Sequence, residues 1–120
     1  MKRIMKSILL SSGLLLTATT LSFSHSVVTE SNPENDALLD IAPEHIEVSF
    51  SKPTRIVKAS LSLNNGTPIK LALSTKEPTK IIRFSPIPKI IGSYIVKWRA
   101  LSEDGHALKG RLQFSITEPK

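Results

Sequence analysis

Hydrophobic and polar residues alternate with a period of two along most of the chain after residue 44. In the stretch HIEVSF, the apolar residues Ile46, Val48 and Phe50 alternate with polar ones. Alternation of this kind is typical of a strand with one buried face. It recurs in the stretches 55–63, 80–84, 92–101 and 108–116. The pattern predicts an all-β domain.

Turn residues separate the predicted strands. The sequence NNG at 64–66 tolerates positive φ angles, and the prolines after residue 84 end strand pairing. We expect about seven short antiparallel strands, arranged as a Greek-key barrel or sandwich. The segment 34–44 is compatible with one helical turn before Pro43. Four further prolines are expected in loops or at sheet edges: Pro33, Pro53, Pro68 and Pro78.

The first 24 residues have the composition of an export signal. A basic start is followed by a short apolar stretch at 8–16 and by small residues that end at Ser24. We expect residues 1–24 to be a cleaved signal peptide and residues 25–120 to be the mature domain. Cleavage after Ser26 fits the same rule and would remove His25. No later stretch is apolar enough to cross a membrane.

Charge and sulfur content restrict the function. Removal of the three basic residues of the signal lowers the formal net charge from +6 to +3, and the remaining basic residues are scattered along the sequence. A nucleic-acid-binding protein has them clustered, so we expect no nucleic-acid partner. The chain has no cysteine, and both methionines, Met1 and Met5, lie in the signal. A metal site in the mature chain would therefore use nitrogen and oxygen ligands.

Two of the three histidines are candidate metal ligands. His106 follows Asp104 by two positions, so both side chains project to the same side of an extended segment, and Gly105 lets the backbone bend between them. A simple hairpin turn would explain these residues equally well. His45 begins a strand, where an exposed polar residue is ordinary.

His25 has a special role if it is the mature N-terminus. Its α-amine and its ring Nδ1 would then form a chelate on one metal ion. Together with Asp104 and His106 they supply three nitrogens and one anionic oxygen, a donor set that suits tetragonal Cu(II). The other interpretation of His25 is a frayed terminus without a partner, because the sequence does not show that residue 25 comes close to the turn at 104–106. If the three residues meet, we expect them to hold one Cu(II) ion per chain.

The sequence resembles the CopC family of periplasmic copper-resistance proteins. The resemblance includes SNP at 31–33, AP at 42–43 followed by IEVSFS, and the stretch W-R-x-x-S-x-D-x-H at 98–106 followed by G-x-x-x-F at 110–114. It implies a cupredoxin-like or immunoglobulin-like fold of seven strands, a periplasmic location and Cu(II) ligation by His25, Asp104 and His106. It also implies a CopD-like inner-membrane protein as a partner.

Two departures from the resemblance refine the expected copper chemistry. Some relatives carry a carboxylate after FS near the Cu(II) site, whereas this chain has Lys52. Relatives with a Cu(I) site use a methionine-rich loop, and the mature chain has no methionine. We therefore expect a Cu(II)-only protein with no Cu(I) site.

The favoured hypothesis is a monomeric, non-enzymatic carrier that sequesters Cu(II) or delivers it to a membrane transporter. One alternative is a copper histidine-brace oxidase similar to a polysaccharide monooxygenase. Against this, Asp104 would fill a coordination position that such an enzyme leaves open, and a single Trp and a single Tyr provide little sugar-binding surface. Another alternative is an immunoglobulin-like interaction module without a metal, in which Tyr94 and Trp98 are only core residues.

Overall fold

The computed structural model describes residues 27–119, and these residues form eight strands. The strands are β1 (Val28–Asn32), β2 (Ala37–Leu39), β3 (Ile46–Leu63), β4 (Ile69–Lys70), β5 (Ala72–Leu73), β6 (Thr79–Ser85), β7 (Gly92–Leu101) and β8 (Ala107–Ile116). All pairings are antiparallel except that of β2 with β8. The all-β prediction is confirmed, with eight strands in place of about seven. In the described residues, no helix is long and apolar enough to span a membrane.

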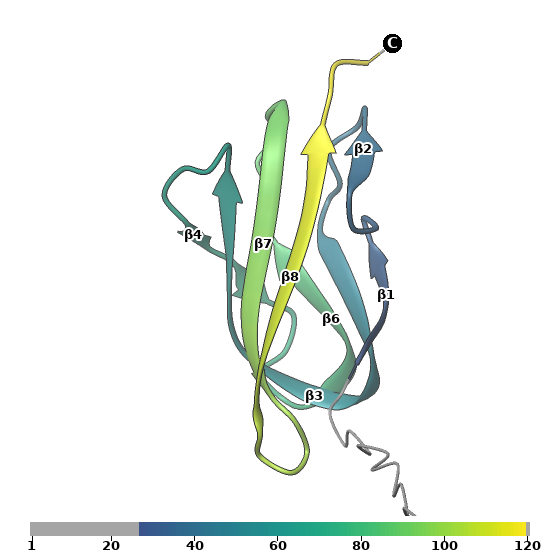
Figure 1. The fold of residues 1–120 in the computed structure, drawn as a ribbon, viewed down its shortest axis with the longest axis vertical. Helices are drawn as coiled ribbons and strands as arrows, with labels where there is room; N and C mark the ends of the chain where they lie inside the picture. Colours follow the sequence, from purple (N-terminus) through teal and green to yellow (C-terminus); the bar gives the residue numbers. More distant parts are fainter. Residues whose placement is uncertain (1–26, 120) are drawn as a thin grey trace, which may run out of the picture.

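The long strand β3 belongs to both layers of the sandwich. Its first part pairs with β1 and β6, and its second part pairs with β4 and β7 (Figure 1). The alternation predicts separate strands over 45–50 and 55–63. They are one strand of 18 residues, and Pro53 lies inside it rather than in a loop. Pro53 falls within the register shift between Ser49 and Thr54, where the pairing of β3 with β6 is irregular, so its missing N–H interrupts no regular ladder.

The segment expected to form a helical turn forms the short strand β2. The Asp36 N–H donates to the Gln113 carbonyl at 2.7 Å, and the Thr117 N–H donates to the Leu39 carbonyl at 2.7 Å. Ala37–Leu39 pairs in parallel with the last residues of β8 between these two bonds. Hydrogen bonds to β8 therefore outweigh the weak local preference for a helix.

The predicted apolar faces of the strands meet in one core. Tyr94 stacks on Phe114 with the ring centroids 5.0 Å apart, and the ring centroids of Trp98 and Phe84 are 5.7 Å apart. The Tyr94 hydroxyl donates to the Pro88 carbonyl at 2.9 Å, which satisfies the polar end of a fully buried ring. Both Tyr94 and Trp98 are core residues, as expected.

The hairpin of β7 and β8 carries the candidate site. The two strands pair continuously from Gly92 opposite Ile116 to Leu101 opposite Ala107. The loop that joins them, residues 102–106, lies at one end of the sandwich, and β1 begins near the same end (Figure 1).

Candidate metal centre

The loop 102–106 is a tight turn closed by backbone hydrogen bonds. The Ser102 N–H donates to the His106 carbonyl at 3.0 Å, and the Gly105 N–H donates to the Ser102 carbonyl at 2.9 Å. Gly105 has a φ of 84°, in the region that favours glycine, and a Cβ built there would meet no atom within 4 Å. Glycine is therefore required by the backbone conformation rather than by lack of space.

Ser102 connects the two predicted ligands. Its side chain is buried, with 6 % of the residue exposed. The hydroxyl donates to Oδ1 of Asp104 and accepts from the N–H of His106 at 3.1 Å. Ser102 is a functional residue that the sequence did not reveal. Serine side chains bond readily to nearby backbone groups in turns, but this preference does not distinguish a buried serine that supports ligands from an exposed one.

The structure brings the side chains of Asp104 and His106 together. Oδ2 of Asp104 lies 3.1 Å from Nδ1 of His106, and their side chains are 38 % and 63 % exposed. Protein ligands bind a first-row metal ion at about 2.0–2.2 Å, so two neighbouring ligands in a square plane lie about 3 Å apart. A carboxylate and an imidazole at this separation can act as neighbouring ligands of one ion.

A shallow hollow beside the loop connects it to β3. Its volume is about 240 Å³, and its lining includes Pro53 and Arg55 of β3 and Ser102, Glu103 and Gly105 of the loop. The guanidinium of Arg55 adds positive charge on one side of a loop that carries two carboxylates. The hollow leaves the loop accessible from solvent.

The third predicted ligand, His25, lies outside the described residues. Val27, the first of them, is tied to β3, because its N–H donates to the Ser51 hydroxyl at 3.0 Å and its carbonyl accepts from the Ser51 N–H at 2.8 Å. Within residues 27–119, no group of three or more His, Cys, Asp or Glu residues could hold a metal ion. The described residues therefore include two of the three predicted ligands, Asp104 and His106.

His45 has a different environment from His106. Its Nε2 lies 3.9 Å from Oε2 of Glu47, and the same carboxylate oxygen accepts a hydrogen bond from Nε of Arg83 at 3.0 Å. Glu47 lies on β3 and Arg83 on β6, and His45 comes directly before β3. Glu47 thus links His45 to Arg83 on the surface. His45 is an exposed polar residue at the start of a strand, as the sequence predicts.

The fold and the loop together define a class of protein. It is a small β-sandwich that presents a carboxylate and an imidazole side by side on an end loop, as a nitrogen- and oxygen-based metal site requires. The model of the CopC domain matches residues 28–117 of this chain. The chain therefore belongs to the CopC family.

Individual relatives agree with this assignment. The chain is 27 % identical to copper resistance protein C of Escherichia coli, over 94 % of this chain and 98 % of that protein. It is 28 % identical to the copper transport protein CutJ of Bacillus subtilis over 79 % of this chain, which spans 18 % of the length of CutJ. The names of the two relatives refer to copper transport and copper resistance.

Solved structures share the fold. The crystal structure of CopC from Methylosinus trichosporium OB3b has a TM-score of 0.64 and 23 % identity, and the match covers 80 % of this chain and 97 % of that one. The crystal structure of selenomethionine PcoC, a copper resistance protein from E. coli, has a TM-score of 0.58 and 25 % identity, with 76 % and 99 % covered. The predicted fold class is confirmed at the level of a CopC-like sandwich.

Proposed function

We propose that this protein is an exported carrier of Cu(II) in copper resistance, which sequesters the ion in the periplasm or delivers it to a membrane transporter. The observation that carries the proposal is the Asp104–His106 pair, held 3.1 Å apart by a loop that Ser102 organises. Membership of the CopC family and the copper-related names of its relatives support copper as the metal.

The proposed ligand set is His25, through its α-amine and ring, together with Asp104 and His106. One residue extends a chain by at most ~3.6 Å, so the two residues before Val27 can span at most about 7 Å. Val27 is fixed against β3 at the end of the sandwich that also carries the loop (Figure 1). A cleavage after Ser24 would then create the chelating terminus within reach of this end.

One Cu(II) ion per chain and no Cu(I) site follow from the available donors. Three nitrogens and one carboxylate oxygen favour Cu(II), whereas Cu(I) prefers sulfur ligands. The proposed mature chain, residues 25–120, contains neither cysteine nor methionine. Reduction of the bound ion would therefore weaken its binding and provide a route for release. A CopD-like inner-membrane protein is the proposed recipient, and the carrier is proposed to act as a monomer.

Mass spectrometry of the protein recovered from the periplasm tests the proposal. The expected mass is that of residues 25–120, because only this cleavage gives His25 a free amine. Recovery of a chain that begins at Val27 would contradict the proposed site. As a control, chemical acetylation of the terminal amine is expected to abolish tight Cu(II) binding while leaving the fold intact, as measured by circular dichroism.

A further inference from the structure

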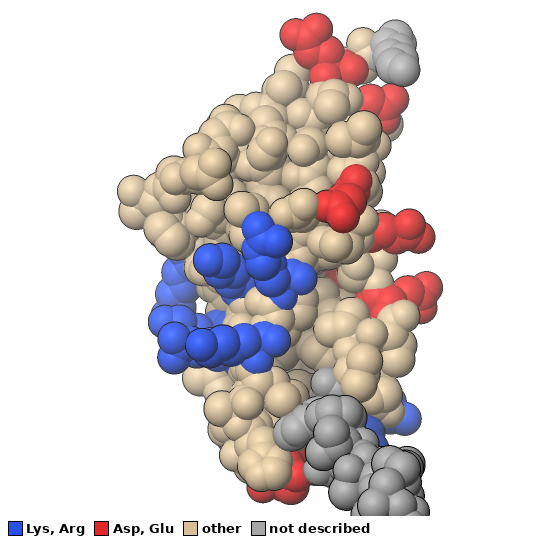
Figure 2. Space-filling view, viewed as in Figure 1, with Lys and Arg blue, Asp and Glu red and all other residues tan. Residues whose placement is uncertain are grey.

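The outer face of the sheet formed by β3, β7 and β8 is strongly basic. The residues that give it this charge are exposed and occur in three strands that are distant in the sequence: Lys58, Lys97, Arg99, Lys109 and Arg111. Figure 2 shows Lys and Arg side chains gathered in this part of the molecule. The basic residues, which are scattered along the sequence, are thus collected by strand pairing. We call these five residues the basic face.

The basic face consists of like charges placed directly opposite one another. In the register of the sheet, Lys58 faces Arg99, Arg99 faces Lys109, and Lys97 faces Arg111. Like charges in directly opposed positions destabilise a sheet. In the described part of the chain, the ion pairs join other residues, so no carboxylate neutralises these five. The arrangement is unfavourable for folding and suits a partner that brings negative charge.

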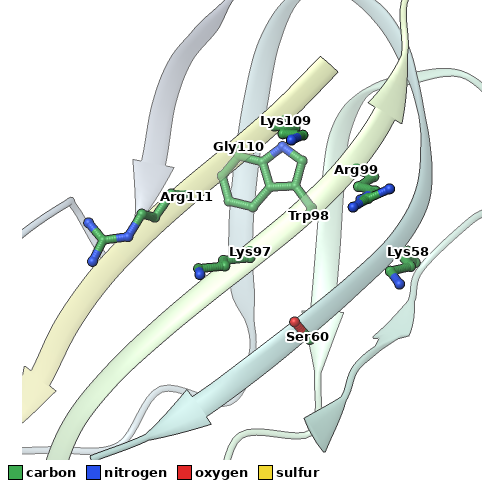
Figure 3. A pocket seen from close by; sticks show the side chains of 8 residues that line it. All are labelled: Lys58, Ser60, Lys97, Trp98, Arg99, Lys109, Gly110 and Arg111. Carbon is green, nitrogen blue, oxygen red and sulfur yellow. The ribbon is translucent and has the colours of Figure 1, made fainter. Parts of the chain in front are cut away.

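A hollow of about 500 Å³ lies between the cationic side chains. Figure 3 shows these side chains around it, with Ser60 and Trp98 among the lining residues. No acidic residue lines the hollow. The two rows of cations lie two positions apart along the strands, or about 7 Å, so several anionic groups can approach the face at once.

Two further features indicate a broad anionic surface as the partner. Along β7 the outward-facing positions on either side of the cations are apolar: Leu101 is 38 % exposed, and Ile95 is partly buried. Acidic side chains lie along the other edge of the molecule (Figure 2), the edge where Figure 1 shows β1 and β2. The molecule is therefore polarised, with positive charge and apolar side chains together on one face.

We propose that the basic face docks onto an anionic phospholipid surface. Basic residues near such a surface each contribute about 1 kcal/mol, and the exposed Leu101 side chain at the edge of the basic face adds contact with the interface. A compact acidic site on a protein would pair with only a few of the five cationic side chains, whereas a bilayer can contact all five and the flanking apolar residues together. Docking would hold the β7–β8 loop near the membrane.

The test is sedimentation of the metal-free protein with lipid vesicles. Vesicles of phosphatidylcholine alone are compared with vesicles of equal parts phosphatidylcholine and phosphatidylglycerol. The triple variant K97Q/R99Q/K109Q is expected to bind the anionic vesicles about 100-fold more weakly than the wild type, because each charge strengthens binding about fivefold. Salt of about 1 M, where the screening length is about 3 Å, should also abolish binding.

A matched variant separates the basic face from net charge. K70Q/K76Q/K80Q removes the same number of charges from exposed positions outside the basic face: Lys70 on β4, Lys76 between β5 and β6, and Lys80 on β6. This variant should retain at least half of the wild-type free energy of binding to the anionic vesicles. Equal losses in the two variants, or equal binding to both vesicle types, would overturn the proposal. Failure of the wild type to bind anionic vesicles while it binds poly-L-glutamate through the face would also overturn it. Because copper is absent, the outcome is independent of the proposed Cu(II) site.

Discussion

At the scale of single residues, Ser102 organises the loop that holds Asp104 beside His106. Alternation in an extended segment places positions i and i+2 on one side, and Gly105 indicates a bend. Ser102 is buried, and its hydroxyl bonds to the Asp104 carboxylate and to the backbone of His106. Its hydroxyl acts through contacts that exist only once the turn has formed. Sequence spacing alone does not distinguish such a serine from a surface one.

Ser102→Ala is expected to weaken both the loop and copper binding. The substitution leaves the N–H of His106 with a poorer acceptor and removes the donor to Asp104. Loss of a residue that supports a ligand costs about 10- to 100-fold in metal affinity, and loss of a buried hydroxyl costs about 1–2 kcal/mol of folding free energy. Isothermal titration with Cu(II) and thermal unfolding measure the two effects. Ser93→Ala, at an exposed position of β7, is the control and should change neither.

Gly105→Ala is expected to cost about 1 kcal/mol or more of folding free energy, since alanine disfavours the φ of 84°. Gly105→Asn should be milder, because asparagine tolerates positive φ better than alanine does. Chemical denaturation of both variants measures the difference. Equal stability of the alanine and asparagine variants would show that the loop does not hold this conformation in solution.

At the scale of strands, the alternation located the main elements, but tertiary pairing decided their limits. The pattern breaks at Pro53, which favoured two separate strands, yet the chain continues through both layers because each half finds a partner there. β2 contains one alanine and two leucines, residue types that favour a helix locally, and its parallel pairing with β8 depends on contacts 77 positions away in sequence. Local propensity carries no information about such pairings.

Gly110→Ala tests the packing of the β7–β8 hairpin. Gly110 lies opposite Trp98, and a Cβ built on it would lie 1.9 Å from the indole. The ring must therefore move, and overpacking of this kind costs about 1–3 kcal/mol. Because the chain has one tryptophan, its fluorescence reports this change directly. Unchanged emission and stability would contradict the placement of the indole over Gly110. Gln113→Ala, on the same strand, should leave the emission unchanged.

At the scale of the whole molecule, the sequence indicated the family but not the distribution of charge. The W-R-x-x-S-x-D-x-H stretch carries the resemblance because its residues are adjacent in the sequence. The basic face depends on the register of β3, β7 and β8, and register is set by core packing of the opposite sheet face. A property that arises from three strands side by side cannot be obtained from the order of residues along one of them.

Copper affinity is expected to fall as the pH falls. The proposed ligands include an amine and imidazoles, which bind metal only in the deprotonated form, and a free α-amine ordinarily titrates near ~7.7–8.0. Protons therefore compete with Cu(II) increasingly below this range, and each pH unit lowers the affinity by about tenfold for each proton displaced. Competition titrations at several pH values between about 6 and 8 measure the slope. An affinity that does not change with pH would exclude the terminal amine as a ligand.

The proposal that copper binds at the β7–β8 loop is tested most directly by the Cu(II) affinity of His106→Ala, measured beside that of His45→Ala. Both variants remove one exposed histidine, but only His106 lies against Asp104 in the loop. His106→Ala is expected to lower the affinity by more than about 100-fold, which exceeds the 10- to 100-fold loss expected for a residue that only supports a ligand, whereas His45→Ala should leave the affinity unchanged. Equal affinities for His106→Ala and the wild type would contradict the assignment of copper to this loop.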